Sequence, residues 1–261
     1  MALYEIKEEK ERIILVGVST RENDDTEDSL DELKDLVKTA GAEAVGRVIQ
    51  KRELVHPGTY VGKGKIEEIR ELLWELDATG IVCDDELSPA QMNNLTDILD
   101  VKVMDRTMVI LDIFAGRAST SEGKIQVELA QLKYRQSQLT GAGRAMSRLG
   151  GGIGTRGPGE KKLEMDRRLI KNRIAQLNRE LREVKRHREL TREQRTKNRI
   201  PVVAIVGYTN AGKSSLLSLV SGSEVMARDM LFATLDTTTR KIELPHGQPL
   251  LLTDTVGFIR N

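Results

Sequence analysis

The sequence is poor in the features that mark secreted or membrane proteins. Cys83 is the only cysteine among 261 residues, so no disulfide can form within the chain, which fits a reducing compartment. No apolar run approaches the ~18 residues of a membrane-spanning helix. The N-terminal stretch is rich in Glu and Lys and lacks the apolar core of a signal peptide. We therefore expect a cytoplasmic protein without a membrane span.

The net charge of +1 hides a strong segregation of charge along the chain. Residues 1–132 carry 16 Lys and Arg against 28 Asp and Glu, residues 133–199 carry 20 against 7, and residues 200–261 carry 5 of each. A basic segment set apart in this way indicates a polyanionic partner. A solvated helix face would give the same composition and is the alternative.

Strand-like and helix-like segments alternate through the first part of the chain. Helical spacing over residues 28–40 and 66–76 separates short apolar runs, which are typical of buried strands and lie at 11–18, 45–49, 81–83 and 101–103. This alternation predicts an α/β fold with a parallel sheet, which we assign to an N-terminal subdomain of residues 1–118.

Two loops of this subdomain have residues that could bind ligands. The Gly-Lys-Gly-Lys stretch at 62–65 could hold a phosphate, although a loop that caps the following helix is the more ordinary interpretation. The acidic run Asp84-Asp85-Glu86 could bind a cation, but solvated loop acids are more common.

A seven-residue rhythm begins after residue 121. Steps of four and three connect Ile125, Leu129, Leu132, Gln136 and Leu139, and the same rhythm returns at Leu163, Ile170, Ile174, Leu177, Leu181 and Val184. Helices with this rhythm pack along a common seam, so we predict an antiparallel coiled-coil hairpin over residues 119–199. Its second helix, from about residue 160 to 197, would be about 57 Å long at 1.5 Å per residue. We interpret the hairpin as a basic arm.

The connector between the two helices, residues 141–159, contains eight glycines. Glycine lowers both helix and strand propensity, so we predict a loop at the tip of the hairpin. Arg144, Arg148 and Arg156 lie in this connector and are candidate RNA-binding residues, because arginine pairs with phosphates and stacks on bases. A passive linker is the alternative.

A glycine-rich stretch lies between an apolar run at 202–206 and a helix-competent run at 216–220. Strand, glycine loop and helix form the context of a phosphate-binding P-loop, and a chance turn is the alternative. We expect Lys213 to contact the β and γ phosphates and the Ser214 hydroxyl to bind Mg²⁺. The candidate phosphate-binding residues are Gly207, Tyr208, Thr209, Asn210, Ala211, Gly212, Lys213 and Ser214.

A second glycine turn ends the apolar run at 249–253 and comprises Asp254, Thr255, Val256 and Gly257. An Asp-x-x-Gly turn at this distance from a P-loop is typical of a GTPase, in which the Asp holds the metal and the Gly amide senses the γ phosphate. A threonine between the two motifs would complete the metal shell. Thr234 is our first choice, and Thr237, Thr238 and Thr239 remain competitors.

Together these motifs resemble the HflX family of ribosome-associated GTPases, within the Obg-HflX-like translation-factor GTPases. The resemblance rests on residues 60–65, 150–160, 207–214, 231–236 and 254–259, spread over nearly the whole chain. It implies a factor that binds and hydrolyses GTP, cycles between GTP and GDP, and associates with the large (50S) ribosomal subunit to split or rescue stalled ribosomes.

Carried over to this sequence, the resemblance implies a nucleotide site that includes residues 207–214 and 254–257. The segment between them contributes Phe232, Ala233, Thr234, Leu235 and Asp236. The implied metal ligands are Ser214, Thr234 and Asp254, and the implied catalytic residues are Lys213, Thr234 and Gly257.

The sequence departs from the family pattern in two places. Thr237 stands where the family usually has Pro, which would loosen that segment. The guanine-reading Asn-Lys-x-Asp motif is absent from residues 200–261, so we expect only the first half of a P-loop GTPase domain, with an exposed sheet edge, in a fragment of a longer protein.

Phe258 follows the second turn, where many small GTPases have a glutamine that orients the attacking water. We therefore expect slow intrinsic hydrolysis and stimulation by the ribosome. We also expect a monomer. Two other function classes stay open: an RNA-binding module with a vestigial nucleotide site, and an ATP-dependent RNA-remodelling enzyme.

Overall fold

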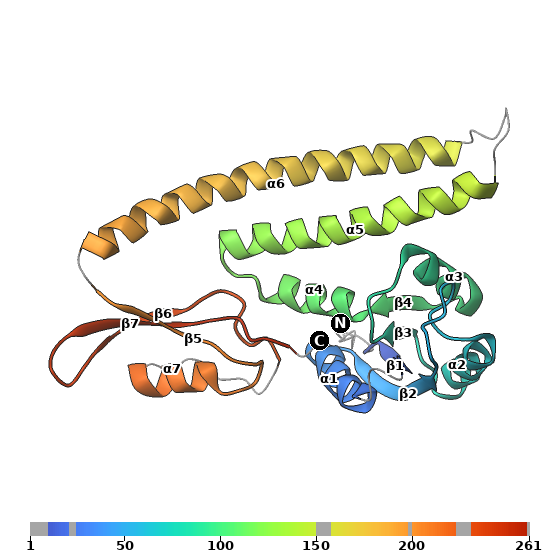
Figure 1. Cartoon of the computed structure of the whole chain (residues 1–261), viewed down its shortest axis with the longest axis horizontal. Helices are drawn as coiled ribbons and strands as arrows, with labels where there is room; N and C mark the ends of the chain where they lie inside the picture. Colours follow the sequence, from blue (N-terminus) through green and yellow to red (C-terminus); the bar gives the residue numbers. More distant parts are fainter. Residues whose placement is uncertain (1–9, 21–24, 150–157, 198–199, 223–230, 260–261) are drawn as a thin grey trace, which may run out of the picture. The chain divides into compact units, whose positions relative to one another are not determined.

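The computed structural model describes residues 10–20, 25–149, 158–197, 200–222 and 231–259, and the side chains among them except those of 140–163 and 191–199 (Figure 1). The chain divides into two compact units, residues 1–110 with 144–146 and residues 111–143 with 147–261. No helix in the described part of the chain is long and apolar enough to cross a membrane.

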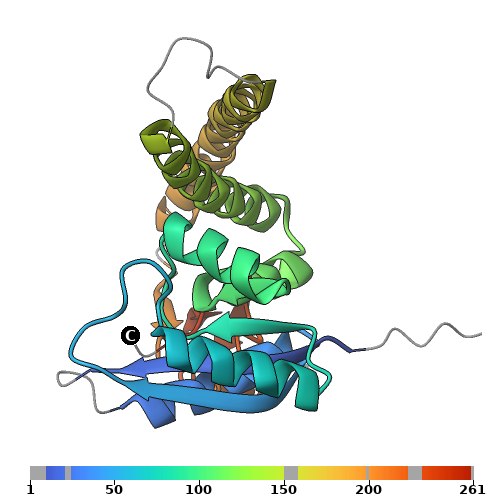
Figure 2. The same cartoon turned by 90° about the vertical axis from the view of Figure 1, so that its right-hand side faces the viewer.

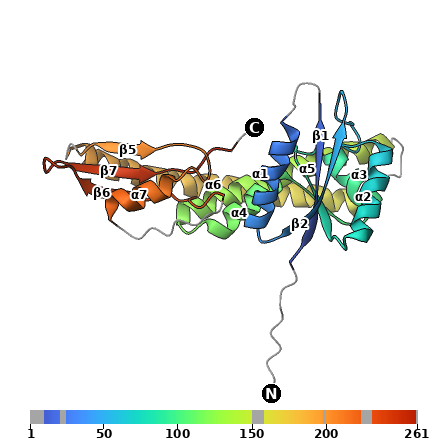
Figure 3. The ribbon, with the colours of Figure 1, turned by 90° about the horizontal axis from the view of Figure 1, so that it is seen from below.

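The first unit is built on a parallel sheet with the strand order β2-β1-β3-β4. Figure 3 shows α1 on one face of this sheet and α2 and α3 on the other. The helices change face because the strand order reverses beside β1 and the crossovers between parallel strands are right-handed. The predicted parallel α/β fold is confirmed. Its elements are β1 (Arg12–Ser19), α1 (Thr26–Thr39), β2 (Glu43–Lys51), α2 (Lys63–Glu75), β3 (Gly80–Cys83), α3 (Pro89–Leu99) and β4 (Lys102–Asp105).

The sheet is covered on both faces, which explains why β1 is a continuous apolar run. On one face Ile14 and Val16 join a buried cluster with Ile69 of α2 and Leu95 of α3. On the other face Gly17 lies against α1, where an added Cβ would come 3.0 Å from Thr26 and 3.2 Å from Leu30. The core of this unit is therefore divided between the two sides of β1.

The helix α4 (Arg106–Arg117) was not predicted from the sequence. Its signals are nevertheless present: Asp105 Oδ1 accepts a hydrogen bond from the Met108 N–H at 2.9 Å, as an N-cap does. Val109 and Ile113 follow at helical spacing, and both are buried.

The Gly-Lys-Gly-Lys stretch begins α2, and Gly62 is its N-cap residue. The Gly62 N–H donates to Gln50 Oε1 at 2.8 Å, so the loop is fixed to β2. Tyr60, just before it, is almost fully buried, and its backbone is left-handed with φ of +64°. These contacts support the helix-capping interpretation of the stretch.

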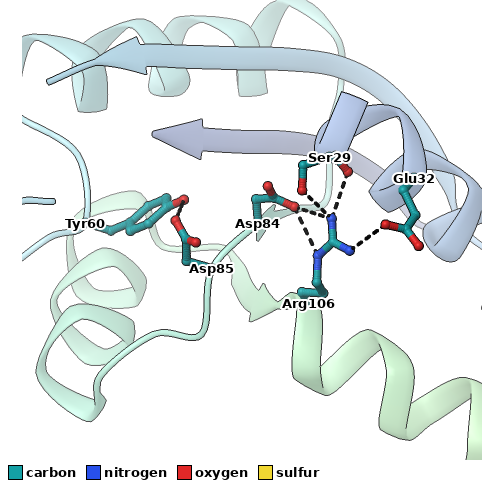
Figure 4. Close-up of polar contacts among 6 residues, drawn as sticks. All are labelled: Ser29, Glu32, Tyr60, Asp84, Asp85 and Arg106. Carbon is teal, nitrogen blue, oxygen red and sulfur yellow. Dashed lines mark hydrogen bonds and ion pairs between the residues drawn. The ribbon is translucent and has the colours of Figure 1, made fainter. Parts of the chain in front are cut away.

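Arg106 connects β3 to α1 (Figure 4). Its Nη2 donates to Asp84 Oδ1 at 2.6 Å and to the Ser29 carbonyl and hydroxyl at 2.8 Å each. Its Nη1 donates to Glu32 Oε2 at 3.2 Å. The Arg106 and Asp84 side chains are only 13% and 10% exposed, so water and salt screen the ion pair weakly.

The neighbouring Asp85 accepts a hydrogen bond from the Tyr60 hydroxyl at 2.7 Å (Figure 4). Burial and the nearby Asp85 carboxylate raise the pKa of Tyr60. Burial likewise raises the pKa of the Cys83 thiol. Two of the three loop acids considered as a cation site thus have partners within the unit, and the described residues include no group of three His, Cys, Asp or Glu suited to a metal ion.

The second unit contains a three-stranded sheet of order β5-β7-β6, with β5 parallel and β6 antiparallel to β7. Figure 1 shows α7 on one face of this sheet. At the edge strand β5, Val202 and Val203 are 58% and 46% exposed, although their sequence is typical of a strand covered on both faces. This is the expected first part of a P-loop domain. Its elements are β5 (Val202–Ile205), α7 (Lys213–Ser221), β6 (Thr239–Glu243) and β7 (Pro249–Asp254).

The helical hairpin consists of α5 (Ser121–Leu149) and α6 (Pro158–Lys197), which lie side by side in Figures 1 and 2. Arg188 pairs with Glu122 at 2.8 Å, and Arg173 pairs with Glu128 at 2.7 Å. As the residue number rises on α5 it falls on α6, so the helices are antiparallel. Leu177 of the predicted seam is 1% exposed and Leu129 is 8% exposed.

The prediction of a loop over residues 141–159 needs correction. The helix α5 continues to Leu149 and α6 begins at Pro158, so both ends of this stretch are helical. Only two of the eight glycines, at 141 and 143, precede residue 150, and most of residues 144–149 favour helix. Arg144 and Arg148 therefore lie on α5, whereas Arg156 lies outside the described residues.

We expect Arg106→Met to destabilise the first unit by about 3 kcal/mol, because it leaves the Asp84 and Glu32 carboxylates without their partner. Native-state hydrogen exchange of the β1 amides measures this free energy. Lys102→Met is the control, since the pair of Lys102 with Glu11 is about half exposed and contributes less than about 1 kcal/mol. Equal losses of stability in Arg106→Met and Lys102→Met would contradict a structural role for the buried Arg106 ion pairs.

Candidate phosphate and metal site

The loop between β5 and α7 depends on two left-handed residues. Asn210 has φ of +57° and Gly212, the N-cap of α7, has φ of +82°. A side chain at Gly212 would strain this backbone. At Gly207, by contrast, an added Cβ would come no closer than 3.7 Å to Lys213, an ordinary contact. Of the two glycines of the motif, Gly212 is therefore the one that the turn requires.

A pocket lies over this loop and is lined by residues 209–215, residues 232–234, Thr255 and Gly257. It thus combines the P-loop with both later motifs. The other predicted nucleotide-site residues do not line it; these are Gly207, Tyr208, Leu235, Asp236, Asp254 and Val256.

Three oxygen-bearing side chains from three segments meet beside the pocket. Ser214 Oγ donates to Asp254 Oδ2 at 2.6 Å and Thr234 Oγ1 donates to the same oxygen at 2.8 Å. The two hydroxyl oxygens lie 2.9 Å apart. Among the competing threonines, Thr239 instead contacts Thr253 across the β6–β7 pair at 3.0 Å. The structure thus brings Thr234 to the other two predicted metal ligands.

The chemistry of this cluster fits Mg²⁺. Asp254 is 1% exposed, and its Oδ1 is buried without a hydrogen-bond partner among the described residues. A buried carboxylate oxygen without a partner is costly, and a cation or water would remove that cost. Carboxylate and hydroxyl oxygens are also the ligands that hard divalent cations prefer.

Hydrogen bonds join the second glycine turn to the P-loop. The Phe258 N–H donates to the Gly207 carbonyl at 3.1 Å, and the Thr209 N–H donates to the Phe258 carbonyl at 2.8 Å. Gly257 lies so close to the loop that an added Cβ would be 2.6 Å from Thr209 Cα. Lys213 Nζ donates to the Tyr208 carbonyl within the same loop.

The segment that carries Thr234 is also held by residues that the motifs did not indicate. Phe232, with φ of +52°, is buried edge-on against Phe114 at a ring-centroid distance of 4.8 Å. Arg117 Nη1 donates to the Phe232 carbonyl at 3.0 Å. Phe114 and Arg117 precede Phe232 by 115 or more residues, so the spacing of the motifs did not indicate that they belong to the site.

Asp236 is anchored in a similar way. Its carboxylate accepts hydrogen bonds from the N–H and hydroxyl groups of both Ser119 and Thr120, at 2.5 to 2.9 Å. Partial burial alone would raise its pKa, but these four hydrogen bonds outweigh that effect and lower the pKa of Asp236 to about 2. Its carboxylate therefore faces the start of α5 and not the pocket.

We expect Gly257→Ala to lower the affinity for GTP with Mg²⁺ about tenfold or more, because the methyl group forces the turn and the P-loop apart. Nucleotide titration measures the effect. Gly64→Ala is the control, since an added Cβ there meets no atom within 4 Å. Wild-type affinity in Gly257→Ala would refute this close packing.

Comparison with known proteins finds a family model for each of the three parts of the chain. Three family models match in succession: "GTP-binding GTPase N-terminal" over residues 27–115, "GTP-binding GTPase Middle Region" over 117–195 and "50S ribosome-binding GTPase" over 202–261.

Relatives named GTPase HflX match nearly the whole chain. That of Lacrimispora saccharolytica is 69% identical over 258 residues, which cover 99% of this chain and 61% of the relative. That of Escherichia coli is 46% identical over 251 residues, which cover 96% of this chain and 59% of the relative. The chain thus spans about three fifths of the length of these relatives.

A solved structure, titled "crystal structure of SsGBP and GDP complex", is 26% identical to this chain with a TM-score of 0.54. The match covers 96% of this chain and 64% of that one. With the relatives matched over nearly all of its residues and the family models in the same order, the chain belongs to the HflX family of GTPases.

Proposed function

We propose that the protein containing this chain is a GTP-binding and GTP-hydrolysing factor that associates with the large ribosomal subunit and splits or rescues stalled ribosomes. The observation that carries the nucleotide part is the meeting of Ser214, Thr234 and Asp254 beside a P-loop pocket. The match of residues 202–261 to the family model "50S ribosome-binding GTPase" supports the ribosomal part.

Each predicted catalytic residue has a role that its position allows. Lys213 would exchange the Tyr208 carbonyl for oxygens of the β and γ phosphates, and the Gly257 amide would sense the γ phosphate. Ser214, Thr234 and Asp254 would hold Mg²⁺, which when bound offsets the negative charge of the phosphates. Because Thr234 belongs to the segment over the pocket, the order of that segment would depend on the nucleotide.

Phe258 explains why hydrolysis should be slow without a partner. It follows Gly257 directly, its side chain is 58% exposed, and a phenyl ring cannot orient a water molecule by hydrogen bonding. The ribosome would supply the missing alignment.

The helical hairpin would supply the contact with ribosomal RNA. Basic side chains are exposed along the described part of α6, including those of Arg168, Lys171, Arg179, Arg182, Lys185 and Arg186. At 40 residues this helix is about 60 Å long, so it offers an extended positive surface to a phosphate backbone. Arg144 and Arg148 on α5, and Arg156 in the connecting sequence, remain candidate RNA-binding residues.

Two rival functions make different predictions. An RNA-binding module with a vestigial nucleotide site would bind RNA equally well without nucleotide, and the intact cluster at Asp254 disfavours it. An ATP-dependent RNA-remodelling enzyme would prefer ATP. Competition between GTP and ATP for the full-length protein separates this rival from the proposed GTPase.

We expect Lys213→Ala to lower the GTP affinity or the turnover by at least about tenfold, because it removes the side chain that contacts the β and γ phosphates. Lys241→Ala, which removes an equal charge from β6, is the matched control. Nucleotide titration and single-turnover hydrolysis measure both variants. Unaltered binding and turnover in Lys213→Ala would count against the nucleotide site.

We expect large ribosomal subunits to accelerate GTP hydrolysis by the full-length protein by a factor on the order of 10³, the scale on which supplied transition-state groups act in other GTPases. Steady-state turnover with increasing large subunits measures this, and small subunits are the control. An unchanged rate at saturating large subunits would refute the ribosomal part of the proposal.

A further inference from the structure

The five residues 232–236 connect the metal cluster, which is the group of candidate metal ligands Ser214, Thr234 and Asp254, to the base of the hairpin. Thr234, in the middle, contacts Ser214 and Asp254. Residues on both sides of Thr234 are held by the stretch that ends α4 and begins α5. Two residues of chain span at most about 7 Å, so a large displacement of Thr234 must carry Asp236 with it.

The contact at Asp236 completes the first turn of α5. Thr120 is the N-cap residue: its carbonyl accepts from the Lys124 N–H at 3.0 Å, and its hydroxyl accepts from the Gly123 N–H at 2.9 Å. Asp236 in turn accepts the N–H groups of Ser119 and Thr120, both at 2.9 Å. N–H groups at the start of a helix lack partners within it, and a negative charge is favourable there.

Gly123, the third residue of α5, provides an independent sign of the same contact. It is buried, and an added Cβ would clash with the Asp236 carboxylate. Glycine lowers helix propensity, so this position gives up helix stability to leave room for the carboxylate. At Gly116 of α4, by contrast, an added Cβ would meet no atom within 4 Å.

A second contact holds the other side of Thr234. The buried Phe232 ring packs against Phe114, and Arg117 binds the Phe232 carbonyl. Residues 114–120 thus hold the segment on both sides of the residue that reaches the metal cluster.

We propose that Asp236 is a positioning residue that couples the nucleotide site to the hairpin: its carboxylate completes the start of α5 while Thr234 is held at the metal cluster, and both contacts are lost together. This inference rests on the proposed GTP-binding function. Coupling between two sites is reciprocal, so a ligand that orders the start of α5 raises the affinity for triphosphate.

The test uses Gly123→Ala in the full-length protein, with Gly116→Ala as the matched control. Gly123→Ala raises helix propensity but expels the carboxylate. A purely local effect would therefore stabilise the start of α5, whereas loss of the proposed coupling would destabilise it. In Gly123→Ala we expect GTPγS with Mg²⁺ to bind about tenfold more weakly, which is the size of a lost helix-cap contact. GDP should bind less than about twofold more weakly. Gly116→Ala should keep both wild-type affinities.

Amide hydrogen exchange gives a readout that does not depend on turnover. In the wild type, residues 121–126 should exchange more slowly with GTPγS and Mg²⁺ than with GDP. Gly123→Ala and Asp236→Ala should lose this difference, and Asp236→Ala, which changes no residue of α5, serves as the second variant should Gly123→Ala fold poorly. The coupling is overturned if both variants retain the wild-type difference in exchange rate. It is also overturned if the wild type shows no such difference although it binds GTPγS tightly. A wild type that binds no guanine nucleotide overturns the proposed function instead.

Discussion

The buried Asp254 carboxylate at the end of β7 is the constraint on which the candidate nucleotide site depends. Burial of a charged carboxylate is unfavourable unless hydrogen bonds or a cation compensate it. Ser214 and Thr234 compensate Oδ2, and each comes from a different segment, so this one oxygen brings α7 and the segment over the pocket together. The other oxygen, Oδ1, has no partner among the described residues, which leaves a position where a cation is favoured.

Asp84 in the first unit is also a poorly exposed carboxylate at the end of a strand, but it has a cationic side chain as its partner. Asp84 follows β3 as Asp254 ends β7, so each lies at the carboxyl end of a strand. The strand β3 pairs in parallel with β1 and β4, and β7 pairs in parallel with β5 and antiparallel with β6. Arg106 supplies the positive charge at Asp84, whereas among the described residues only hydroxyl groups hydrogen-bond to the Asp254 carboxylate. The partner of the carboxylate, and not its place on the strand, therefore distinguishes a structural ion pair from a candidate metal ligand.

Local sequence patterns sufficed for the parallel α/β fold, the hairpin and the P-loop, because periodicity and glycine spacing are properties of short segments. The extent of α5 was misjudged because glycine content was averaged over residues 141–159, although the glycines concentrate after residue 149. The choice of Thr234 over its neighbours needed the geometry at Asp254. The contact of Asp236 with Ser119 joins residues 117 apart and follows from no repeat or motif.

The two contacts that flank Thr234 differ in what their rupture would cost. The Phe232 ring is 4% exposed, so its release would expose a large apolar surface to water. Asp236 is only partly buried, so water can reach its carboxylate and replace the hydrogen bonds that it accepts. If the segment opens, we therefore expect Phe232 to stay in place while Asp236 leaves the start of α5. Thr234 lies between them, so a small rotation about Phe232 is enough to withdraw its hydroxyl from Asp254.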